Sequence, residues 1–338
     1  MRASRVRAYI AESPFLAICF FSLFSFCIGL FAFWLFLSSP YAASHYATRG
    51  LRFSMSDYPL INPLLLCNVD QKDFNQDKKL AALINTFVKN RISQGAAEDM
   101  SVYLINYATG KWVGVDENER YDPASLLKVP LMIAYFKNAE TNPGILSETT
   151  SYNGDDQNDG EYFRSGENIT SGRMYSIDSL IRSMIENSDN TAAALLELYA
   201  DKSSLYDVYT DLGLPVPADA PNVEYISAKN YAYFFRVLYN GTYLDKKYSE
   251  EALEYLAQSK VSGIRDGVPS GVKVAQKFGE RTLVDETTGQ VAEREFHDCG
   301  IVYKESGPYL LCVMSRGQDF DKLKQNIRDL SKLIYDNI

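Results

Sequence analysis

The order of hydrophobic patterns along the chain constrains its fold more than any other feature. Five short apolar or alternating segments are typical of strands: residues 102–104, 112–115, 272–276, 299–303 and 309–314. Between the second and third of them, from about residue 125 to 256, the pattern is mainly helical. This order predicts an α+β fold in which both ends of the domain build one antiparallel sheet around a helical insert.

Amphipathic helices are predicted on either side of the strands. One is marked by Leu80, Ile84, Phe87, Val88 and Ile92, and the other by Leu323, Ile327, Leu330 and Ile334. The domain, residues 76–338, is large for a single core, so we expect two lobes with a cleft between them. The acidic, glycine-bearing segment 153–161 is expected to be a solvated loop.

The N-terminal region contains a run of 23 residues without a charge, from Phe15 to Leu37. As a helix this run would measure about 35 Å, which is enough to cross a bilayer. It is longer than the apolar region of a cleavable signal peptide, which has about 7 to 15 residues. We therefore predict an uncleaved transmembrane signal anchor. Cleavage at residues 41–44 is the alternative.

Three arginines, Arg2, Arg5 and Arg7, precede the apolar run. By the positive-inside rule, residues 1–14 are expected in the cytoplasm and the folded domain outside it. The predicted localisation is therefore the cell membrane, with a single span. Residues 38–75 are expected to form a stalk that packs onto the domain.

Charge argues against one class of partner. The whole chain has a net charge of −9, and its first 49 residues contribute +3, which leaves −12 for the remainder. A domain this acidic is not expected to bind nucleic acid.

The number of cysteines limits how many disulfides the domain can form. Outside the apolar run the chain has Cys67, Cys299 and Cys312, which allow one disulfide at most. Cys299 and Cys312 fall on neighbouring strand segments, where they form either a cross-strand bridge or two buried thiols. The thiols are favoured, because buried free cysteines are common in strands.

Histidine is nearly absent, which restricts the chemistry. His45 lies in the stalk, so His297 is alone in the domain, where a satisfied strand histidine is expected. A zinc site with several histidines cannot form within one chain, and no metal or cofactor is predicted. A Ser-His-Asp site would have to use His297, so the natural base for a nucleophile in this domain is a lysine.

Ser125-Leu-Leu-Lys128 supplies such a nucleophile and base. It opens an apolar helical run, so both side chains lie one turn apart on the same face. A second Ser-x-x-Lys at residues 270–273 precedes a strand, where residues three apart point to opposite faces. On this motif alone, Ser125 would be interpreted as a helix N-cap.

Two further motifs follow in order: Ser188-Asp189-Asn190, and Lys277-Phe278-Gly279. Together the three motifs supply two hydroxyls, two amines and an amide, which suits acyl transfer through a serine ester. Taken separately, the second motif has the composition of a helix cap, and Lys277 could be a solvated strand lysine.

With their flanks, residues 121–130 and 186–193 resemble the class A β-lactamases and related penicillin-binding serine hydrolases. The resemblance covers the chain from about Asp99 to the C-terminus. It implies a two-lobed fold, with the active site between a helical lobe and a five-stranded antiparallel sheet. This agrees with the architecture predicted from the patterns.

The resemblance also implies roles for individual residues. Ser125 would be the acylated nucleophile, Lys128 the base, and Ser188 the relay that protonates the leaving nitrogen. Substrate contacts would come from Asn190, Lys277, Gly279 and Glu280. Backbone N–H groups of Ser125 and Glu280 would form the oxyanion hole.

Two departures from that family narrow the function. Members usually carry Thr or Ser where Phe278 stands, and that hydroxyl helps to hold a substrate carboxylate. Class A β-lactamases also carry a Glu-x-x-Leu-Asn loop whose Glu activates water for deacylation, and nothing from Asp201 to Lys229 has this form. The acyl-enzyme is therefore expected to persist.

These observations favour a membrane-anchored serine hydrolase or acyltransferase that acts on peptidoglycan-type peptides. One alternative is a β-lactamase that uses an unrecognised water-activating acid. The other is a non-catalytic domain that binds the cell wall.

Overall fold

The computed structural model describes residues 57–63, 75–163, 166–217 and 223–338. All of them belong to one unit, Leu51–Ile338. The predicted anchor at residues 15–37 and most of the stalk lie outside the described residues. Among the residues that are described, no helix is long and apolar enough to span a membrane.

The described residues form the following helices and strands. The helices are α4 (Lys78–Ser93), α5 (Lys128–Thr141), α6 (Ile177–Glu186), α7 (Asn190–Tyr199), α8 (Lys202–Asp211), α9 (Ala228–Asn240), α10 (Lys246–Ala257) and α11 (Phe320–Asn337), with short 3-10 turns η2 (Ala124–Leu127), η3 (Pro143–Ser147) and η5 (Arg265–Gly267). The strands are β1 (Asp99–Asn106), β2 (Trp112–Val115), β3 (Arg120–Tyr121), β4 (Thr149–Tyr152), β5 (Arg173–Ser176), β6 (Ile226–Ser227), β7 (Val274–Val284), β8 (Val291–Val302) and β9 (Tyr309–Gly317).

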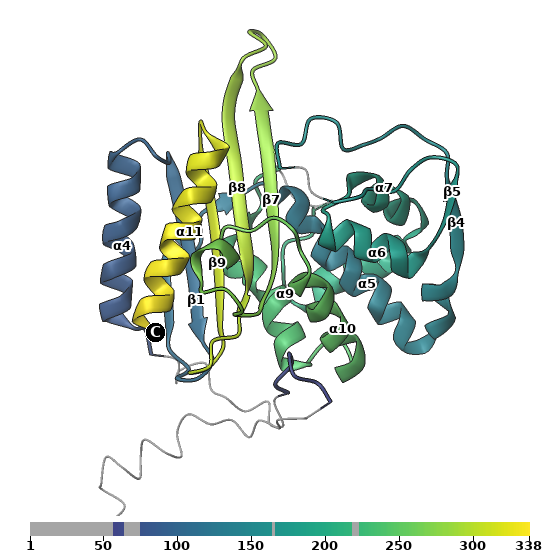
Figure 1. Cartoon of the computed structure of the whole chain (residues 1–338), viewed down its shortest axis with the longest axis horizontal. Helices are drawn as coiled ribbons and strands as arrows, with labels where there is room; N and C mark the ends of the chain where they lie inside the picture. The colour runs from purple at the N-terminus through teal and green to yellow at the C-terminus, as the bar shows by residue number, and fades with distance from the viewer. Residues whose placement is uncertain (1–56, 64–74, 164–165, 218–222) are drawn as a thin grey trace, which may run out of the picture. The chain divides into compact units, whose positions relative to one another are not determined.

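A five-stranded sheet in the order β2-β1-β9-β8-β7 forms the centre of the fold. Every neighbouring pair in it is antiparallel, and β1 from the start of the domain pairs with β9 from its end. In Figure 1, α4 and α11 lie on one side of this sheet, and the helical region with α5, α6 and α7 lies on the other. The sheet built from both chain ends and the helical insert are thus confirmed.

The two faces of the sheet bury different hydrophobic clusters. Val274 and Phe278 of β7 belong to the cluster of α4 and α11, whereas Ala275 belongs to that of the helical lobe. Side chains alternate along a strand, so Lys277 shares the face of Ala275 and is directed toward the helical lobe. This alternation puts Lys277 and Phe278 in different environments.

Two strands are longer than the sequence patterns predict. β7 was expected at residues 272–276 and extends to Val284, and β8 begins at Val291 rather than at residue 299. The extra residues form the far end of a hairpin that rises beyond the other strands (Figure 1). Most of them are exposed or half-buried, so they carry no apolar pattern by which they could be recognised.

The helical region also contains short sheets that were not predicted. β4 pairs with β5, and β3 pairs with β6, in two two-stranded sheets. Each has strands of four residues or fewer, which is too short for a periodic signal in the sequence.

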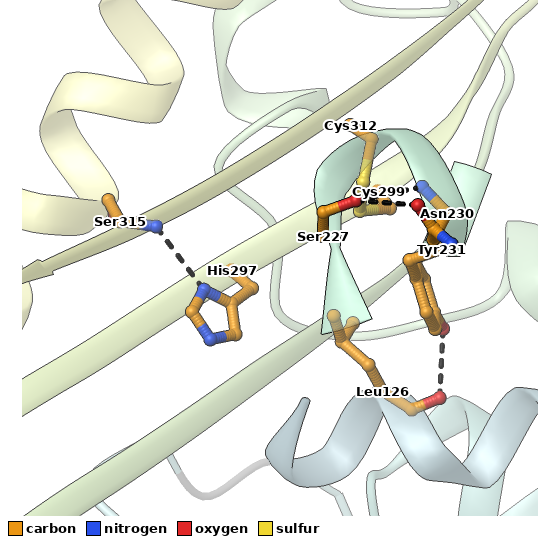
Figure 2. The surroundings of a disulfide bond; sticks show 8 residues. All are labelled: Leu126, Ser227, Asn230, Tyr231, His297, Cys299, Cys312 and Ser315. Carbon is orange, nitrogen blue, oxygen red and sulfur yellow. Dashed lines mark hydrogen bonds between the residues drawn. A yellow bond between two sulfur atoms is a disulfide. The ribbon is translucent and has the colours of Figure 1, made fainter. Parts of the chain in front are cut away.

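Cys299 and Cys312 are joined by a disulfide, so the preference for free thiols was wrong. The two residues are directly opposite each other on β8 and β9. Figure 2 shows the bridge beneath the start of α9, next to Ser227 and Tyr231.

Part of the predicted stalk packs onto the domain. Leu60 and Ile61 are buried, and both of their backbone N–H groups donate to the Glu250 carboxylate on α10, at 2.8 and 2.9 Å. These two hydrogen bonds hold residues 60 and 61 against α10, on the helical side of the sheet.

Candidate active site

Ser125 and Lys128 lie at the junction of η2 and α5. Neither helix uses a side chain as its N-cap, since Pro123 and Leu127 occupy those positions. The capping interpretation of Ser125 is therefore wrong. Its hydroxyl is left for another role, and Lys128 follows one turn later with only 5% of its surface exposed.

The turn before Ser125 is held in an unusual conformation. Ala124 has a φ of 47°, in the left-handed region that residues with a Cβ seldom adopt. The Asp122 carboxylate accepts the Ala124 N–H at 2.8 Å, and Tyr231 O–H donates to the Leu126 carbonyl at 2.9 Å (Figure 2). These contacts hold the backbone on both sides of Ser125 in place.

Gly279 of β7 packs directly against this turn. A Cβ added at Gly279 would lie 2.8 Å from the Pro123 carbonyl oxygen and 3.1 Å from Leu126 Cγ. Such a separation is well below normal contact distance, and one of the two atoms belongs to the backbone. The predicted site glycine thus allows the third motif to approach the first.

Ser188 reaches the same place from the loop before α7. It too has a left-handed backbone, with φ of 60°. The cap of α7 is Asp189, whose side chain accepts the N–H groups of Thr191 and Ala192. The helix-cap interpretation therefore applies to Asp189, and Ser188 and Asn190 remain available for the site.

Lys128 joins the first two motifs. Its Nζ donates to Asn190 Oδ1 at 2.6 Å, to Ser188 Oγ at 3.2 Å and also to the Ser188 carbonyl. This is the proximity that a proton relay between an amine and a hydroxyl needs.

Lys277 reaches the Ser188 hydroxyl from the sheet. Its Nζ donates to Ser188 Oγ at 2.8 Å and to the Phe278 carbonyl at 3.0 Å. Lys277 has 0% of its surface exposed, so the expectation of a solvated strand lysine was wrong. The Ser188 hydroxyl is consequently flanked by two amines.

The surroundings lower the pKa of both amines. Burial lowers the pKa of Lys128 to about 8, against the opposing effect of the Glu161 and Asp189 carboxylates. The pKa of Lys277 lies well below its usual value, mainly because of burial and then because of the Lys128 charge. Two ammonium groups on one hydroxyl repel each other, so this arrangement favours a neutral amine, which can act as a base.

Phe278 does not enter the site as a polar group. It is 2% exposed and stacks on Phe296 with ring centroids 6.1 Å apart. Its ring centroid also lies 4.3 Å from Lys277 Nζ, within cation–π range. The side chain therefore adds packing beside the amine and offers no hydroxyl to a substrate.

The residue after Gly279 makes a contact that was not foreseen. The Glu280 carboxylate accepts the backbone N–H groups of Tyr162 and Phe163, at 3.0 and 3.1 Å. Tyr162 and Phe163 are thereby attached to β7. The roles of the Ser125 and Glu280 N–H groups as an oxyanion hole stay a prediction.

The segment around Asn158 is more than the solvated loop expected at residues 153–161. Asn158 is fully buried, and its Oδ1 accepts the Asn190 N–H at 2.7 Å while its Nδ2 donates to Asp189 Oδ1 at 3.0 Å. Asn158 is thus held at α7, and Tyr162 is held by Glu280 on β7. The residues between Asn158 and Tyr162 therefore run from α7 to β7. Figure 1 shows this connection passing from β4 above α7 toward β7.

Glu161 lies on that connection and is the residue that sequence reasoning missed. Asn158 and Tyr162 bracket it, and four residues span about 14 Å at most, so it lies close to both anchored positions. Burial raises the pKa of Glu161 to about 7, while the charges of Lys128 and Lys277 lower it. No motif marks this acid, because its position depends on contacts of its neighbours.

His297 is a satisfied strand histidine, as expected. Its side chain is fully buried, with Nε2 2.9 Å from the Asp122 carbonyl and Nδ1 accepting the Ser315 N–H at 3.3 Å (Figure 2). Burial lowers the pKa of His297 to about 3, so the ring stays neutral. It supports the turn before Ser125 and takes no part in the amine cluster.

Comparisons with known proteins agree with this geometry. The model of the beta-lactamase enzyme family matches residues 79–338. Among solved structures, PBP-A has a TM-score of 0.61 and 19% sequence identity, over 78% of this chain and 97% of that chain. A class A beta-lactamase from Mycobacterium abscessus has a TM-score of 0.60 and 20% identity, over 76% and 98%.

A third similar structure is a single-residue mutant of PBP-A as an acyl-enzyme complex with penicillin G, at a TM-score of 0.61, 18% identity and the same coverage as PBP-A. No curated protein sequence matches this chain. The similarity to these structures shows the fold, and the family match covers all seven residues predicted for the site. The chain therefore belongs to the beta-lactamase enzyme family and is a serine hydrolase.

Proposed function

We propose that the protein is a membrane-anchored serine hydrolase or acyltransferase that forms an acyl-enzyme at Ser125 and acts on peptidoglycan-type peptides. The observation that carries the proposal is the convergence of Lys128 and Lys277 on the Ser188 hydroxyl, with Lys128 one helical turn after Ser125 in the chain. An ordinary capped helix does not need two buried amines at one hydroxyl.

Acylation would use Ser125 together with the amines and the hydroxyl that are in contact beside it. The Ser125 oxygen attacks the carbonyl carbon of the scissile amide, and neutral Lys128 takes the hydroxyl proton. Ser188 gives its proton to the leaving nitrogen as the carbon–nitrogen bond breaks, and an ammonium beside it restores that proton. The product is an ester on Ser125 and a free amine. Water or an acceptor amine then attacks the ester.

Two features support a peptide of the cell wall as the substrate, and a third narrows the kind of acyl donor. The apolar run with arginines before it favours a domain outside the cytoplasm. The expected loop with a deacylating Glu is missing, and a long-lived ester suits transfer to an acceptor amine. Phe278 offers no donor for a carboxylate, which favours acyl donors that do not depend on a free C-terminal carboxylate there.

A labelled penicillin tests the acyl-enzyme step. The purified full-length protein should gain one adduct by intact-mass measurement, located at Ser125, and Ser125→Ala should gain none. Ser270→Ala is the matched control, because that serine belongs to the other Ser-x-x-Lys sequence and should leave labelling unchanged. No adduct with either a penicillin or a reactive acyl ester would refute the catalytic proposal.

One observation favours β-lactam hydrolysis as a second candidate. Glu161 is an acid near the two amines, and its pKa of about 7 suits a base that activates water at neutral pH. If it has this role, the adduct should be hydrolysed quickly, and Glu161→Gln should accumulate it. A stable wild-type adduct that Glu161→Gln does not change would support the peptidase or transferase.

The other alternative, a non-catalytic domain that binds the cell wall, predicts a different result for variants tested in cells. A strain with Ser125→Ala would then keep a normal cell wall, whereas deletion of residues 76–338 would not. Equal defects in both strains would support catalysis.

A further inference from the structure

Three glutamates outside the catalytic site meet on the helical side of the sheet. Glu293 and Glu295 are two residues apart on β8 and so share a face, and Glu224 lies just before β6. One carboxylate oxygen of each lies within 4.8 Å of those of the other two. None of the three belongs to the amine cluster.

Glu295 is the anomaly in this group. It has 0% of its surface exposed, and neither of its oxygens has a hydrogen-bond partner among the described residues. His297 Nε2 lies 4.0 Å away, too far to donate, and is occupied by the Asp122 carbonyl. The nearby Arg281 is paired with Asp122. A buried carboxylate without partners is costly, so it needs a proton or a cation.

The resident arginine does not meet this need. Arg316 is opposite Glu295 on β9, and its guanidinium is divided among several acids. It lies 3.7 Å from Glu224, 3.4 Å from Glu119 and 3.8 Å from Asp99, and it also donates to the Arg120 carbonyl. Because this guanidinium also faces Asp99 and Glu119, it leaves at least two negative charges on the three clustered glutamates when all three are ionised. A divalent cation would balance them.

We propose that Glu224, Glu293 and Glu295 bind a calcium ion. The ligand set is made of carboxylate oxygens only, which hard divalent cations prefer. Calcium takes oxygen ligands at about 2.3 to 2.6 Å, so oxygens up to about 5 Å apart can share one ion. Magnesium, with shorter bonds of about 2.1 Å, demands a more regular octahedral geometry than calcium does. The inner ligand is buried, and the two outer ones are half-buried, which leaves a path for the ion and for bound water.

Calorimetric titration of the full-length protein with CaCl2, after EDTA treatment, tests the site. We expect one Ca²⁺ per chain, and an increase in Tm of about 5 °C or more when Ca²⁺ exceeds its Kd a hundredfold. Glu293→Gln should weaken binding at least about tenfold. Glu286→Gln, on the exposed β7–β8 turn, is the matched control and should bind as the wild type does.

Glu295→Gln separates a cation site from a merely structural glutamate. The variant should lose Ca²⁺ binding, yet without Ca²⁺ its Tm should equal or exceed that of the wild type, because it buries no charge. Absence of binding to the wild type at about 10 mM Ca²⁺ would overturn the proposal and leave Glu295 as a protonated acid. Unchanged affinity in Glu295→Gln would overturn it as well.

Discussion

The pH dependence of Ser125 acylation follows directly from the environment of Lys128. Only the neutral amine can take the Ser125 proton. Burial lowers the pKa of Lys128 to about 8, although the Glu161 and Asp189 carboxylates oppose this. We therefore expect the acylation rate to rise about tenfold per pH unit below pH 8 and to level off above it.

The size of the effect follows from the fraction of neutral amine. At pH 7, an amine with a pKa of about 8 is neutral in about one molecule in ten. A lysine with its usual pKa of 10.5 would be neutral in only about one in three thousand. The buried position thus makes the base about 300 times more available at neutral pH.

The assay is single-turnover labelling with a fluorescent penicillin, quenched at intervals between pH 6 and pH 10, with Ser125→Ala as the blank. Glu161→Gln provides a second test, because the Glu161 carboxylate raises the pKa of Lys128. Its removal should shift the midpoint of the profile down by about one pH unit, the effect of a nearby charge at an effective dielectric of about 20. Glu167→Gln, exposed on the same connection, should leave the midpoint unchanged.

Three results would contradict this reasoning. A rate that is flat from pH 6 to pH 9 would mean that Lys128 is not the base. A rate that still rises at pH 10 would mean that its amine is not desolvated in the working enzyme. An upward shift of the midpoint in Glu161→Gln would contradict the proximity of that carboxylate.

Three further predictions concern packing and stability. Gly279→Ala should slow acylation about a hundredfold, because its Cβ would lie 2.8 Å from the Pro123 carbonyl and displace the nucleophile turn; single-turnover labelling measures this. Lys277→Met should abolish acylation yet raise the free energy of unfolding in urea by about 1 to 4 kcal/mol. Because the pKa of Lys277 is lower in the folded than in the unfolded protein, this gain should be larger at pH 6 than at pH 9. Reduction of Cys299–Cys312, which closes a loop with a separation of 13 residues, should lower the free energy of unfolding by about 3 kcal/mol, provided that the thiols are kept blocked.

The sheet and its flanking helices could be predicted because their burial is periodic. Leu80, Ile84 and Val88 are the buried face of α4, as their spacing required. The far half of the β7–β8 hairpin could not be predicted, since Thr282 and Val284 there are exposed and no apolar face repeats. The disulfide could not be predicted, because it depends on the register of β8 against β9. Only when the two cysteines are directly opposite each other can they form a bridge rather than remain two thiols.

The same distinction, between residues marked by a local sequence pattern and residues placed by distant contacts, applies to the candidate active site. Ser125, Lys128 and Ser188 belong to short motifs whose local spacing survives in the fold, so sequence alone could propose them. Glu161 was missed because nothing in its own neighbourhood signals a role. Its place follows from Asn158, an asparagine three residues earlier, which lies against α7 through contacts more than thirty residues away in the chain.

Several features that are unfavourable to folding lie at the three motifs. Ala124 and Ser188 have left-handed backbones without being glycine, and Lys128 and Lys277 are amines withdrawn from water. Each costs stability, of order 1 to 3 kcal/mol for the backbone strain alone. A protein that served only as a scaffold would be expected to lose these destabilising residues, because each can be replaced by Gly or by an apolar residue in a single substitution. Their joint presence around the Ser188 hydroxyl is therefore better explained by chemistry at Ser125 than by the needs of the fold.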